Sequence, residues 1–472
     1  MKNCQVFTSP DVVEKMLDLI GYNSDLMGSK TLENSFGSGN FLLAVVKRYI
    51  LESFNRGYTP SDISRGLSHD IYGYEIDSER FKQTIYKLEQ LIKEYEIPKV
   101  DWKLRNSDYL SDKLDMKFDY IVGNPPYIDY RDLEPSLRDS LRSFDSCKTG
   151  KFDYCYPFIE KSIMELSNTG KMCYLVPNSV FKNVFASNLR EIIKPLATDI
   201  YKISNAAFTE KALVSPVILI LDRTNDVKQL RYHPDNHTTS TLISKDKLGH
   251  KWTFLDQEED ATKKERFGDY FNASLSMVTM CNEAFVIRNL EPEGRFYKNA
   301  NEMLEADLIR IAVSPKSMKS GDKEYVIFPY IVSNGAVKRI KKDQFEKDYP
   351  GIAKHLLNYK EKLSKRDVDK GAEYYEYGRS QGLKYANTEK LLMSTIITNH
   401  VRVEMVSSTS IPYSGIVITS KKKGYDLDLA KKILLSPEFI QYAKAIGVSV
   451  SGSSVRITSK DINNFRFDGV KR

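Results

Sequence analysis

Cysteine, histidine and long apolar runs are all scarce in this chain of 472 residues. The five cysteines are scattered and form no CxxC pair, a pattern typical of reduced, buried thiols and not of a zinc site or disulfide framework. Six histidines give little support to a histidine-based metal centre. The best apolar run, Val217–Leu221, has the length of a strand and not of a membrane span. Residues 1–5 lack the pattern of a signal peptide. We therefore predict a cytoplasmic protein without a bound metal or a membrane segment.

Bulk composition limits the class of protein but not its function. Hydrophobic residues make up 41% of the chain and charged residues 28%, which is ordinary for a soluble globular protein. The length exceeds that of one ordinary core and predicts two or three domains. A formal charge of +7 permits a polyanionic partner without requiring one.

Short apolar runs alternate with helix-like segments between Lys30 and about Asp222. The pattern predicts strands at 30–33, 71–75, 118–122, 172–176, 199–203 and 217–221, with helices at 40–54 and 78–95 among them. Such alternation is typical of an α/β fold with a mostly parallel sheet. In these sheets ligands bind beyond the carboxyl ends of the strands, so chemically active residues are expected just after strands.

The texture of the chain changes after Leu221. Residues 224–262 are polar and loop-like, with a turn at 234–237, and lysine and tyrosine clusters without regular alternation follow. We place a domain boundary between 225 and 245. This predicts one domain over residues 1–235 and an α+β domain over residues 245–472.

A loop with two glycines follows the first predicted strand and opens a helix. Gly37 and Gly39 allow the backbone to turn sharply and to approach a ligand without an intervening Cβ. A third glycine, which a dinucleotide-binding loop needs, is missing. The acidic Glu33 ahead of the loop suits a cationic ligand better than a phosphate. A purely structural turn remains an alternative for the glycine pair alone.

Acidic residues also follow the next two strands. Glu75 can accept hydrogen bonds from both hydroxyls of a ribose, although it could equally be a solvated acid at a helix start. Asp108 can accept from the amino group of an adenine, while Tyr109 covers the face of the ring. Their succession at strand ends favours an adenosyl cofactor over separate structural roles.

The string Asn124-Pro125-Pro126-Tyr127 comes directly after the strand at 118–122. An exocyclic amino group on adenine is a poor nucleophile, because its lone pair is delocalised into the ring. The side-chain oxygen of Asn124 and the carbonyl of Pro125 can accept both amino hydrogens and so favour a pyramidal, nucleophilic nitrogen. Proline has a fixed φ and holds these carbonyls in place. The ring of Tyr127 offers a stacking surface for a base flipped out of a duplex.

With these residues in place, the N-terminal half resembles the gamma-class (Taq-type) N6-adenine DNA methyltransferases of restriction–modification systems. The similar segments are Gln5–Pro10, Glu33–Gly39, Glu75–Asp77, Asp108–Tyr109, Asn124–Tyr127, Phe152–Tyr154, Phe158–Glu160, Gly170–Met172, Val176–Asn178 and Phe208–Lys211. The resemblance covers residues 5–222 and is faint thereafter. It implies a Rossmann-like S-adenosylmethionine-dependent methyltransferase domain, followed by a target-recognition domain.

The resemblance also assigns roles to residues. It implies that S-adenosylmethionine is held by Thr8, Glu33, Gly37, Gly39, Glu75, Ile76, Asp108, Tyr109 and Pro126. It implies catalysis by Asn124, Pro125 and Tyr127, with Phe208 as a second aromatic wall for the flipped adenine. Asn34 departs from the family, which usually has proline there, and this weakens the expected rigidity of the loop.

Basic residues interleave with tyrosines in the second half of the chain. Lys338, Arg339, Lys341 and Lys342 are candidates for phosphate contacts, and Arg379 is a candidate for a further DNA contact. A solvated helix face is the alternative for any one cluster. Because a base-flipping enzyme must recognise duplex DNA, we predict that the C-terminal half reads the sequence.

Three alternatives stay open from the sequence. The same four-residue loop occurs in enzymes that methylate RNA or a protein glutamine, and these typically lack a large recognition domain. The chain could also be the modification subunit of a multi-chain system with a separate specificity protein. A DNA-binding or scaffold protein with a relic cofactor fold is disfavoured by intact Asn124, Tyr127 and Glu75. We expect a monomer acting on double-stranded DNA. The few residues ahead of Gln5 leave no room for a fused nuclease, so a cognate restriction endonuclease is expected as a separate protein.

Overall fold

The computed structural model describes residues 8–203, 216–224, 227–234, 239–254, 265–300, 302–333, 336–422, 424–451 and 454–468. It divides into two compact units. The first comprises Met1–Gln257 with Val448–Gly452, and the second comprises Glu258–Gly447 with Ser453–Arg472. Each unit is described separately below.

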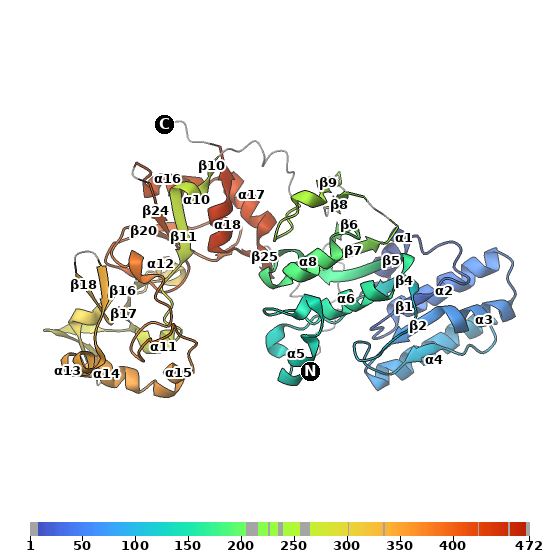
Figure 1. The fold of residues 1–472 in the computed structure, drawn as a ribbon, viewed down its shortest axis with the longest axis horizontal. Helices are drawn as coiled ribbons and strands as arrows, with labels where there is room; N and C mark the ends of the chain where they lie inside the picture. The colour runs from blue at the N-terminus through green and yellow to red at the C-terminus, as the bar shows by residue number, and fades with distance from the viewer. Residues whose placement is uncertain are drawn as a thin grey trace. The chain divides into compact units, whose positions relative to one another are not determined.

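A nine-stranded sheet forms the centre of the first unit (Figure 1). The strand order is β3-β2-β1-β4-β5-β7-β6-β8-β9. The strands are β1 (Thr31–Glu33), β2 (Ile71–Tyr74), β3 (Lys103–Arg105), β4 (Phe118–Gly123), β5 (Leu166–Pro177), β6 (Ala197–Lys202), β7 (Pro216–Asp222), β8 (Gln229–His233) and β9 (Thr241–Ser244).

The sheet is parallel except for two strands. β7 is antiparallel to both β5 and β6, and β9 is antiparallel to β8. The chain moves outward from β1 to β2 and β3, then returns to place β4 on the other side of β1. This reversal creates a topological switch point between β1 and β4, where open α/β sheets bind ligands. The predicted mostly parallel α/β fold is confirmed.

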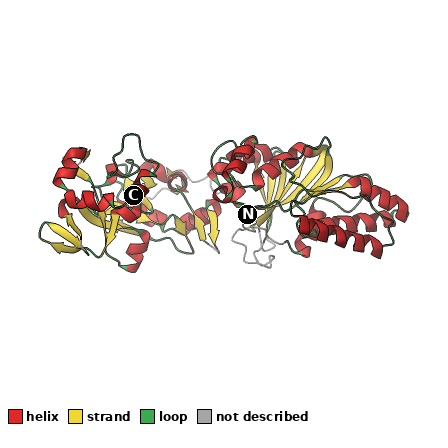
Figure 2. Ribbon diagram, turned by 90° about the horizontal axis from the view of Figure 1, so that it is seen from below, coloured by secondary structure: helices red, strands yellow, loops and turns green. Residues whose placement is uncertain are grey.

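Helices cover both faces of this sheet (Figure 2). One face, with Val122 and Cys173, packs against α1 (Pro10–Leu19), α2 (Asn40–Asn55), α3 (Pro60–Asp70) and α4 (Ser78–Glu94). The other face, with Ile121 and Tyr174, packs against α6 (Cys155–Glu165), α7 (Ser179–Lys182) and α8 (Ser187–Ile193), while α5 (Pro135–Leu141) adds Leu141. Because successive strand residues point to opposite faces, both faces of β4 and β5 are apolar, as a buried parallel sheet requires.

Local sequence explains where the helices start. Asp77 caps α4 by accepting from the backbone N–H groups of Glu79 and Arg80, at 3.0 and 3.1 Å. Thr59 and Asp62 form a capping box ahead of α3. These side chains satisfy backbone donors that have no partner inside a helix.

The second unit is built from small sheets and short helices. Its two four-stranded sheets have the orders β11-β24-β20-β22 and β12-β17-β16-β23. The strands are β10 (Glu265–Arg266), β11 (Phe271–Leu275), β12 (Val286–Arg288), β13 (Glu291–Glu293), β14 (Phe296–Asn299), β15 (Glu302–Glu305), β16 (Ile309–Val313), β17 (Glu324–Ile327), β18 (Tyr330–Ser333), β19 (Ala336–Arg339), β20 (Lys390–Met393), β21 (Ile396–Ile397), β22 (Val403–Val406), β23 (Ile411–Pro412), β24 (Ile416–Ser420), β26 (Ser454–Arg456) and β27 (Arg466–Phe467). β25 (Val448–Ser451) is grouped with the first unit.

The helices of the second unit are α10 (Phe267–Tyr270), α11 (Asn282–Phe285), α12 (Pro315–Ser320), α13 (Lys342–Asp348), α14 (Pro350–Leu357), α15 (Lys360–Ser364), α16 (Leu427–Leu434), α17 (Pro437–Ile446) and α18 (Ser459–Asn464). One core lies under α14 and the β16–β17 pair, and another lies between β11, β24 and α16–α18. The predicted α+β class of this half is therefore confirmed. Throughout the ranges described above, no helix combines the length and apolarity needed to cross a membrane.

The segment predicted as a loop at 224–262 instead contains β8 and β9, which complete the sheet of the first unit. Both strands are short, β9 lies at the edge of the sheet, and each has one buried residue, Leu230 or Ile243, so the apolar signal is weak. Part of the turn predicted at 234–237 lies outside the described residues. The first unit continues to Gln257, beyond the predicted end at 235.

A truncated chain ending at residue 235 should therefore be less stable than one ending at residue 257. The shorter chain lacks Ile243, Leu248 and Trp252, all buried against the sheet, and each large apolar side chain contributes roughly 1.5–3 kcal/mol when fully buried. A lower Tm by roughly 10 °C is expected for a unit of this size. Equal melting temperatures of the two chains in a calorimetric scan would show that β9 and residues 245–254 do not belong to this unit.

Candidate active site

The ends of four neighbouring strands meet at one edge of the first unit's sheet. Parallel pairing sets Glu33 of β1 beside Gly73 of β2, and Tyr74 of β2 beside Arg105 of β3. On the other side, Leu32 pairs with Ile121 of β4. The residues that follow these strands therefore emerge at the same edge, flanking the switch point. Sequence-predicted residues from four separate segments are brought together here.

The glycine loop between β1 and α2 depends on both of its glycines. Gly37 has a φ of 53° and Gly39 a φ of 85°, a left-handed region that other residues rarely adopt. A Cβ on Gly39 would lie 2.6 Å from Cγ2 of Thr84 on α4, so glycine at this position also lets α4 pack closely against the loop. A Cβ on Gly37 would enter open space, which leaves the backbone there accessible to a ligand.

Glu75 holds the glycine loop in place. Its carboxylate is buried and accepts from the N–H of Gly37 at 2.7 Å and the N–H of Asp77 at 2.8 Å. Each oxygen accepts one backbone donor and keeps a lone pair for a further donor, such as a ribose hydroxyl. The next side chain, Ile76, is 60% exposed, which leaves an apolar surface beside this carboxylate.

Glu33 is buried at the switch point, and no described residue gives it a compensating charge. It is 2% exposed, and its Oε2 has no hydrogen-bond partner in the part of the chain that the structure describes. Burial raises the pKa of this carboxyl well above its usual range, the N–H of Leu42 lowers it in part, and Glu75 raises it further. A cation beside Glu33 would relieve this unfavourable arrangement. The sulfonium and ammonium groups of S-adenosylmethionine are such cations, so the residues present fit this cofactor.

Asp108 and Tyr109 differ in how the structure places them. Asp108 is partly exposed after β3 and accepts from the N–H of Leu110 at 3.0 Å and from the hydroxyl of Ser111 at 2.7 Å. Tyr109 is buried, with its hydroxyl donating to Glu165 at 2.6 Å and its ring under the ammonium group of Lys161. In this structure the ring of Tyr109 does not reach the surface where a cofactor would bind.

Asn34 supplies the rigidity that the family obtains from proline. Its buried side chain donates from Nδ2 to Ser162 Oγ at 2.9 Å and to the hydroxyl of Tyr174. Ser162 and Tyr174 are bonded to each other at 2.7 Å, and Tyr109 lies 3.3 Å from Ser162 Oγ. Because the hydroxyl of Tyr109 donates to Glu165, these hydrogen bonds can form one continuous chain from Asn34 to the Glu165 carboxylate. This chain ties the glycine loop to α6, β5 and the loop after β3.

The predicted catalytic loop is held by two contacts at the end of β4. Asn124 donates from Nδ2 to Thr8 Oγ1 at 3.1 Å, and the carbonyl of Thr8 accepts from Asn40 at the start of α2. Thr8 thus joins the loop to the helix that follows the glycines. Pro125 is buried and Pro126 is partly exposed beside them.

Tyr127 lies within reach of two acceptors but has one proton to give. Its hydroxyl is bonded to Asn124 Oδ1 and lies 2.7 Å from the carbonyl of Leu175. A hydroxyl carries one proton, so Tyr127 donates to only one of these two acceptors at a time. The ring of Tyr127 is only 7% exposed, so stacking on a base requires this loop to move. Phe208, predicted as the second aromatic wall, lies outside the described residues.

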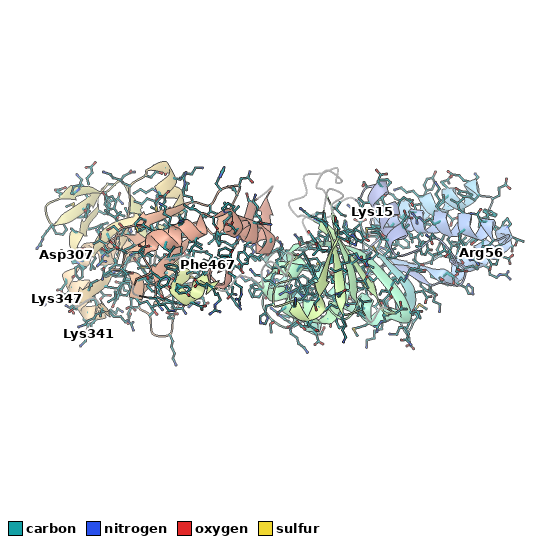
Figure 3. The ribbon with its side chains drawn as sticks, turned by 90° about the horizontal axis from the view of Figure 1, so that it is seen from above. Lys15, Arg56, Asp307, Lys341, Lys347 and Phe467 are labelled. Carbon is teal, nitrogen blue, oxygen red and sulfur yellow. The ribbon has the colours of Figure 1, made fainter. Side chains whose placement is uncertain are left out.

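The predicted DNA contacts of the second unit divide into two groups. Arg339 forms an ion pair with the buried Glu376, and Arg379 forms ion pairs with Asp367 and Asp369. Lys338, Lys341 and Lys342 are exposed at the end of β19 and the start of α13, and Lys341 lies at the outer surface of this unit (Figure 3). The lysines are thus available to phosphates, whereas both arginines already hold this unit together.

The tyrosines that interleave with these basic residues belong largely to the core. Tyr375 and Tyr377 are buried and donate to the carbonyls of Ile340 and Ile327, at 2.7 and 2.8 Å. Arg366 donates to the carbonyls of Thr279, Tyr374 and Glu376, at 2.8 to 2.9 Å. The interleaved pattern therefore reflects packing and backbone capping as well as surface charge.

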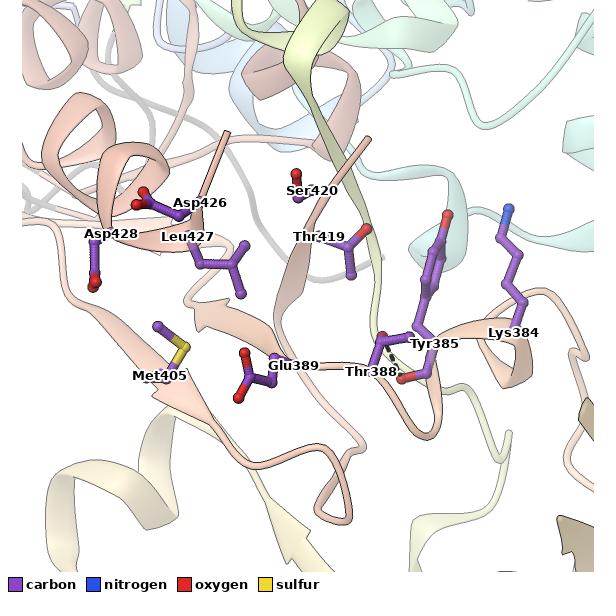
Figure 4. Close-up of a pocket in the computed structure, with 10 residues that line it drawn as sticks. All are labelled: Lys384, Tyr385, Thr388, Glu389, Met405, Thr419, Ser420, Asp426, Leu427 and Asp428. Carbon is purple, nitrogen blue, oxygen red and sulfur yellow. Dashed lines mark hydrogen bonds between the residues drawn. The ribbon is translucent and has the colours of Figure 1, made fainter. Parts of the chain in front are cut away.

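A cavity of about 550 Å³ lies within the second unit (Figure 4). Its lining includes the carboxylates of Glu389, Asp426 and Asp428, and one lysine, Lys384. Asp426 is engaged in capping α16 through the N–H of Leu429. The excess of negative charge disfavours a phosphate ligand, so this cavity is not assigned to the DNA backbone.

Comparison with known proteins identifies the type of catalytic domain. Residues 43–211 match the Eco57I restriction-modification methylase family. Type II methyltransferase M.BstVI of Geobacillus stearothermophilus is 27% identical over 69% of this chain and 60% of its own length. Type II methyltransferase M.PaeR7I of Pseudomonas aeruginosa is 28% identical over 50% of this chain and 44% of its own. Residues 43–211 thus resemble the methylase domain of this restriction-modification family, which confirms the predicted resemblance, and the chain spans 60% or less of the length of these two relatives.

Two solved structures share the fold over nearly the whole chain. One is the type IIL restriction-modification enzyme MmeI in complex with DNA, with a TM-score of 0.61 and 12% identity over 96% of this chain and 65% of that chain. The other is a nuclease-deletion mutant of the type ISP restriction-modification enzyme LlaGI, with a TM-score of 0.54 and 12% identity over 97% of this chain and 46% of that chain. These similarities establish the fold.

Cofactor binding should depend on the ionisation of Glu33. The ionised carboxylate attracts a cation, so affinity for S-adenosylmethionine should be full above the raised pKa of Glu33 and should fall as pH drops through it. Glu33→Gln should bind more weakly at high pH and lose this dependence. Calorimetric titrations at a series of pH values above the ordinary carboxyl pKa measure this affinity for both proteins. A pH dependence unchanged in Glu33→Gln would assign it to another group.

Arg339 and Lys338 should behave differently although they are adjacent on β19. Arg339→Gln removes the ion-pair partner of the buried Glu376 and should lower the free energy of unfolding by about 1–2 kcal/mol, after discounting for solvent screening of the exposed arginine. Lys338→Gln should change it by less than about 0.5 kcal/mol, as is usual at the surface. Urea unfolding of both variants tests this, and equal losses would contradict a structural role specific to Arg339.

Proposed function

We propose that this chain transfers a methyl group from S-adenosylmethionine to the N6 amino group of an adenine in double-stranded DNA, as part of a restriction–modification system. One observation carries the proposal. The Asn124–Tyr127 loop leaves β4 at the switch point, while Glu33 and Glu75 stand at the ends of the next two strands. Two acceptors for an amino group thus lie at the same sheet edge as the buried carboxylate of Glu33 and a glycine loop suited to an adenosyl ligand.

The residues that would hold the cofactor surround the glycine loop. Glu33 faces a positive charge, Glu75 accepts from the ribose, and Ile76 covers an apolar face of the adenine, with Asp108 at its amino group. The proposed set is completed by Thr8, Gly37, Gly39, Tyr109 and Pro126. Tyr109 would contact the cofactor through its backbone, because its ring is buried. When bound, the cofactor supplies an electrophilic methyl group.

Asn124 and Pro125 prepare the amino group for reaction. Asn124 Oδ1 and the Pro125 carbonyl accept the two amino hydrogens, and this favours the pyramidal nitrogen with its lone pair directed outward. Tyr127 competes for the first acceptor, because its hydroxyl can donate either to Asn124 Oδ1 or to the carbonyl of Leu175. Asparagine takes no proton at neutral pH, so its contribution is electrostatic positioning.

Access to a paired adenine requires extrusion of the base from the duplex. The cost of lost stacking is offset in part when an aromatic ring covers the base. Tyr127 would provide this ring after a movement of its loop, and Phe208 is proposed as the opposite wall. The second unit is proposed to read the DNA sequence, with Lys338, Lys341 and Lys342 at phosphates. We further propose that the enzyme is a monomer and that its cognate restriction endonuclease is a separate protein.

Asn124→Ala should abolish most methyl transfer while leaving both ligands bound. The lost acceptor acts on the nitrogen as it becomes pyramidal, so kcat should fall by at least about 100-fold with little change in the affinity for cofactor or DNA. Single-turnover kinetics on DNA from a methylation-free host, followed by sequencing of modified bases, measures both the rate and the position of the methyl group.

Tyr127→Phe is the matched control, because it keeps the ring and removes only the hydroxyl. It removes the hydroxyl that donates to Asn124 Oδ1 and keeps the ring on which a base would stack, so it should retain most of the activity, whereas Tyr127→Ala should not. Near-normal single-turnover rates in Asn124→Ala would exclude amino activation by this loop. Methylation that appears only after a second protein is added would favour the multi-chain alternative.

A further inference from the structure

Val184 and Phe185 form an exposed apolar pair on the short 3₁₀ helix η3 (Val184–Ala186) of the first unit. Val184 is 61% exposed and Phe185 is 41% exposed. Single exposed apolar side chains are common on protein surfaces. Among the described residues, however, these two are the only large exposed apolar side chains that are consecutive in the sequence. The pair therefore presents a continuous apolar surface to water, and an external apolar partner that covers it would be stabilised by its burial.

Hydrogen bonds hold the backbone around this pair. Arg190, which is buried, donates to the carbonyls of Val180 and Asn183, both at 2.8 Å. Asn183 Oδ1 in turn accepts from the N–H of Phe185 at 3.1 Å. The next residue, Ala186, is buried in the core on one face of the sheet. The apolar pair is thus presented on a fixed turn, so little conformational entropy is lost when a partner covers it.

Direct contacts connect Phe185 to the segment that follows the proposed catalytic loop, Asn124–Tyr127. The ring of Phe185 lies against Gly150, where a Cβ would come within 2.1 Å of its Cδ1 atom. Nη2 of Arg142 donates both to the carbonyl of Gly150, at 2.9 Å, and to the hydroxyl of Tyr130, at 3.1 Å. Tyr130 follows the last residue of the catalytic loop by three positions. The apolar pair therefore lies near this loop and belongs to the same unit.

Backbone contacts support the same position. Asp153 forms an antiparallel bridge with Asp129, and the N–H of Tyr154 donates to the carbonyl of Ile128 at 3.0 Å. The strand-like segment that carries these two donors thus runs beside the two residues that directly follow Tyr127. Gly150, which contacts the apolar pair, precedes the Asp153 bridge by three residues, or at most about 11 Å of chain.

The loop that contacts Phe185 carries exposed positive charge. Lys148 and Lys151 lie on either side of Gly150 in the sequence, and both are exposed. Lys148 forms an ion pair with Asp145, but both side chains are exposed, so solvent screens this pair strongly. Lysines bind phosphate as point charges without reading sequence. An apolar pair next to exposed lysines matches a nucleic acid, in which a charged backbone surrounds stacked bases.

We propose that Val184 and Phe185 insert into the DNA beside the target adenine and fill part of the space that the extruded base leaves. This inference rests on the proposed function, in which a base is extruded toward the Asn124–Tyr127 loop. Extrusion costs the stacking of the target base on its neighbours. Apolar side chains, phenylalanine among them, can wedge between base steps that a protein has unstacked. Val184 and Phe185 are thus positioning residues, which stabilise the opened duplex without touching the methyl group or the reacting nitrogen.

Single-turnover methylation of two duplexes tests this proposal with the full-length protein. Both duplexes carry the sequence in which the unaltered protein methylates adenine, and in one of them the base opposite the target is mismatched, so that extrusion costs less. The double variant Val184→Ala/Phe185→Ala should methylate the paired duplex roughly tenfold more slowly, since loss of one stacking contact has an effect of this size. On the mismatched duplex most of this deficit should disappear. Val184→Ala alone changes the more exposed residue and should slow the paired duplex in the same direction.

A fluorescent base follows extrusion without the chemical step. 2-Aminopurine in place of the target adenine becomes brighter when it leaves the stack, so the rise in fluorescence on binding should be smaller in the double variant. Phe185→Leu keeps a large apolar side chain and should retain most of the signal. Leu51→Ala removes an apolar side chain that is 42% exposed on α2, and it should change neither the rate nor the signal.

Three outcomes would contradict the proposal, and they are distinguishable. An unchanged rate and fluorescence signal in the double variant, while the unaltered protein methylates DNA, would overturn this inference alone. Equal losses on the paired and mismatched duplexes, or a weaker affinity for S-adenosylmethionine, would also overturn it, because the pair would then pack against the protein or serve as a general DNA contact. Absence of methylation by the unaltered protein would instead refute the proposed function, and the inference with it.

Discussion

Parallel hydrogen bonding among β3, β2, β1, β4 and β5 is the constraint on which the candidate active site depends. Register fixes Glu33 beside Gly73, Tyr74 beside Arg105 and Gly123 beside Tyr174. A shift of one residue in any pair would move side chains from one packed face of the sheet to the other, where they would meet different helices, so packing specifies each register. The same register fixes where the loops after these strands begin. The glycine loop, Glu75 and the Asn124 loop therefore converge although 91 residues separate Glu33 from Asn124.

The elements of the first unit can be predicted where their apolar patterns are complete. Strands such as 118–122 and 217–221 are apolar on both faces, and the helices at 40–55 and 78–94 carry clear faces and a cap. The sequence pattern does not reveal β3, β8 and β9, since each is a short strand at or next to an edge of the sheet and has few buried residues. The positions of Glu75 and Asn124 follow from the strand-end rule. The burial of the Tyr109 ring cannot be predicted from that rule, because its partners Glu165 and Lys161 lie more than 50 residues away in the sequence.

Asn34 shows how a departure from a family pattern can be misread from sequence. Loss of a proline suggests a looser loop, whereas the structure replaces a backbone restriction with side-chain bonds to Ser162 and Tyr174. These partners lie 128 and 140 residues away, so the compensation has no local signal. Proline restricts the unfolded chain as well, while a buried bond acts only in the folded state. The same loop geometry is thus reached by a different route, with a penalty if any member of the chain is removed.

The same reasoning decides which basic residues are available to DNA. A count of charges cannot distinguish Arg339 from Lys338, yet one neutralises a buried carboxylate and the other is exposed without such a role. A basic side chain is available to DNA when no acidic residue of the protein already neutralises it. Arg339 and Arg379 have partners, and their removal would act first on the folded unit. Availability follows from pairing and burial, and the residues that meet a polyanion need not be those with the most basic local sequence.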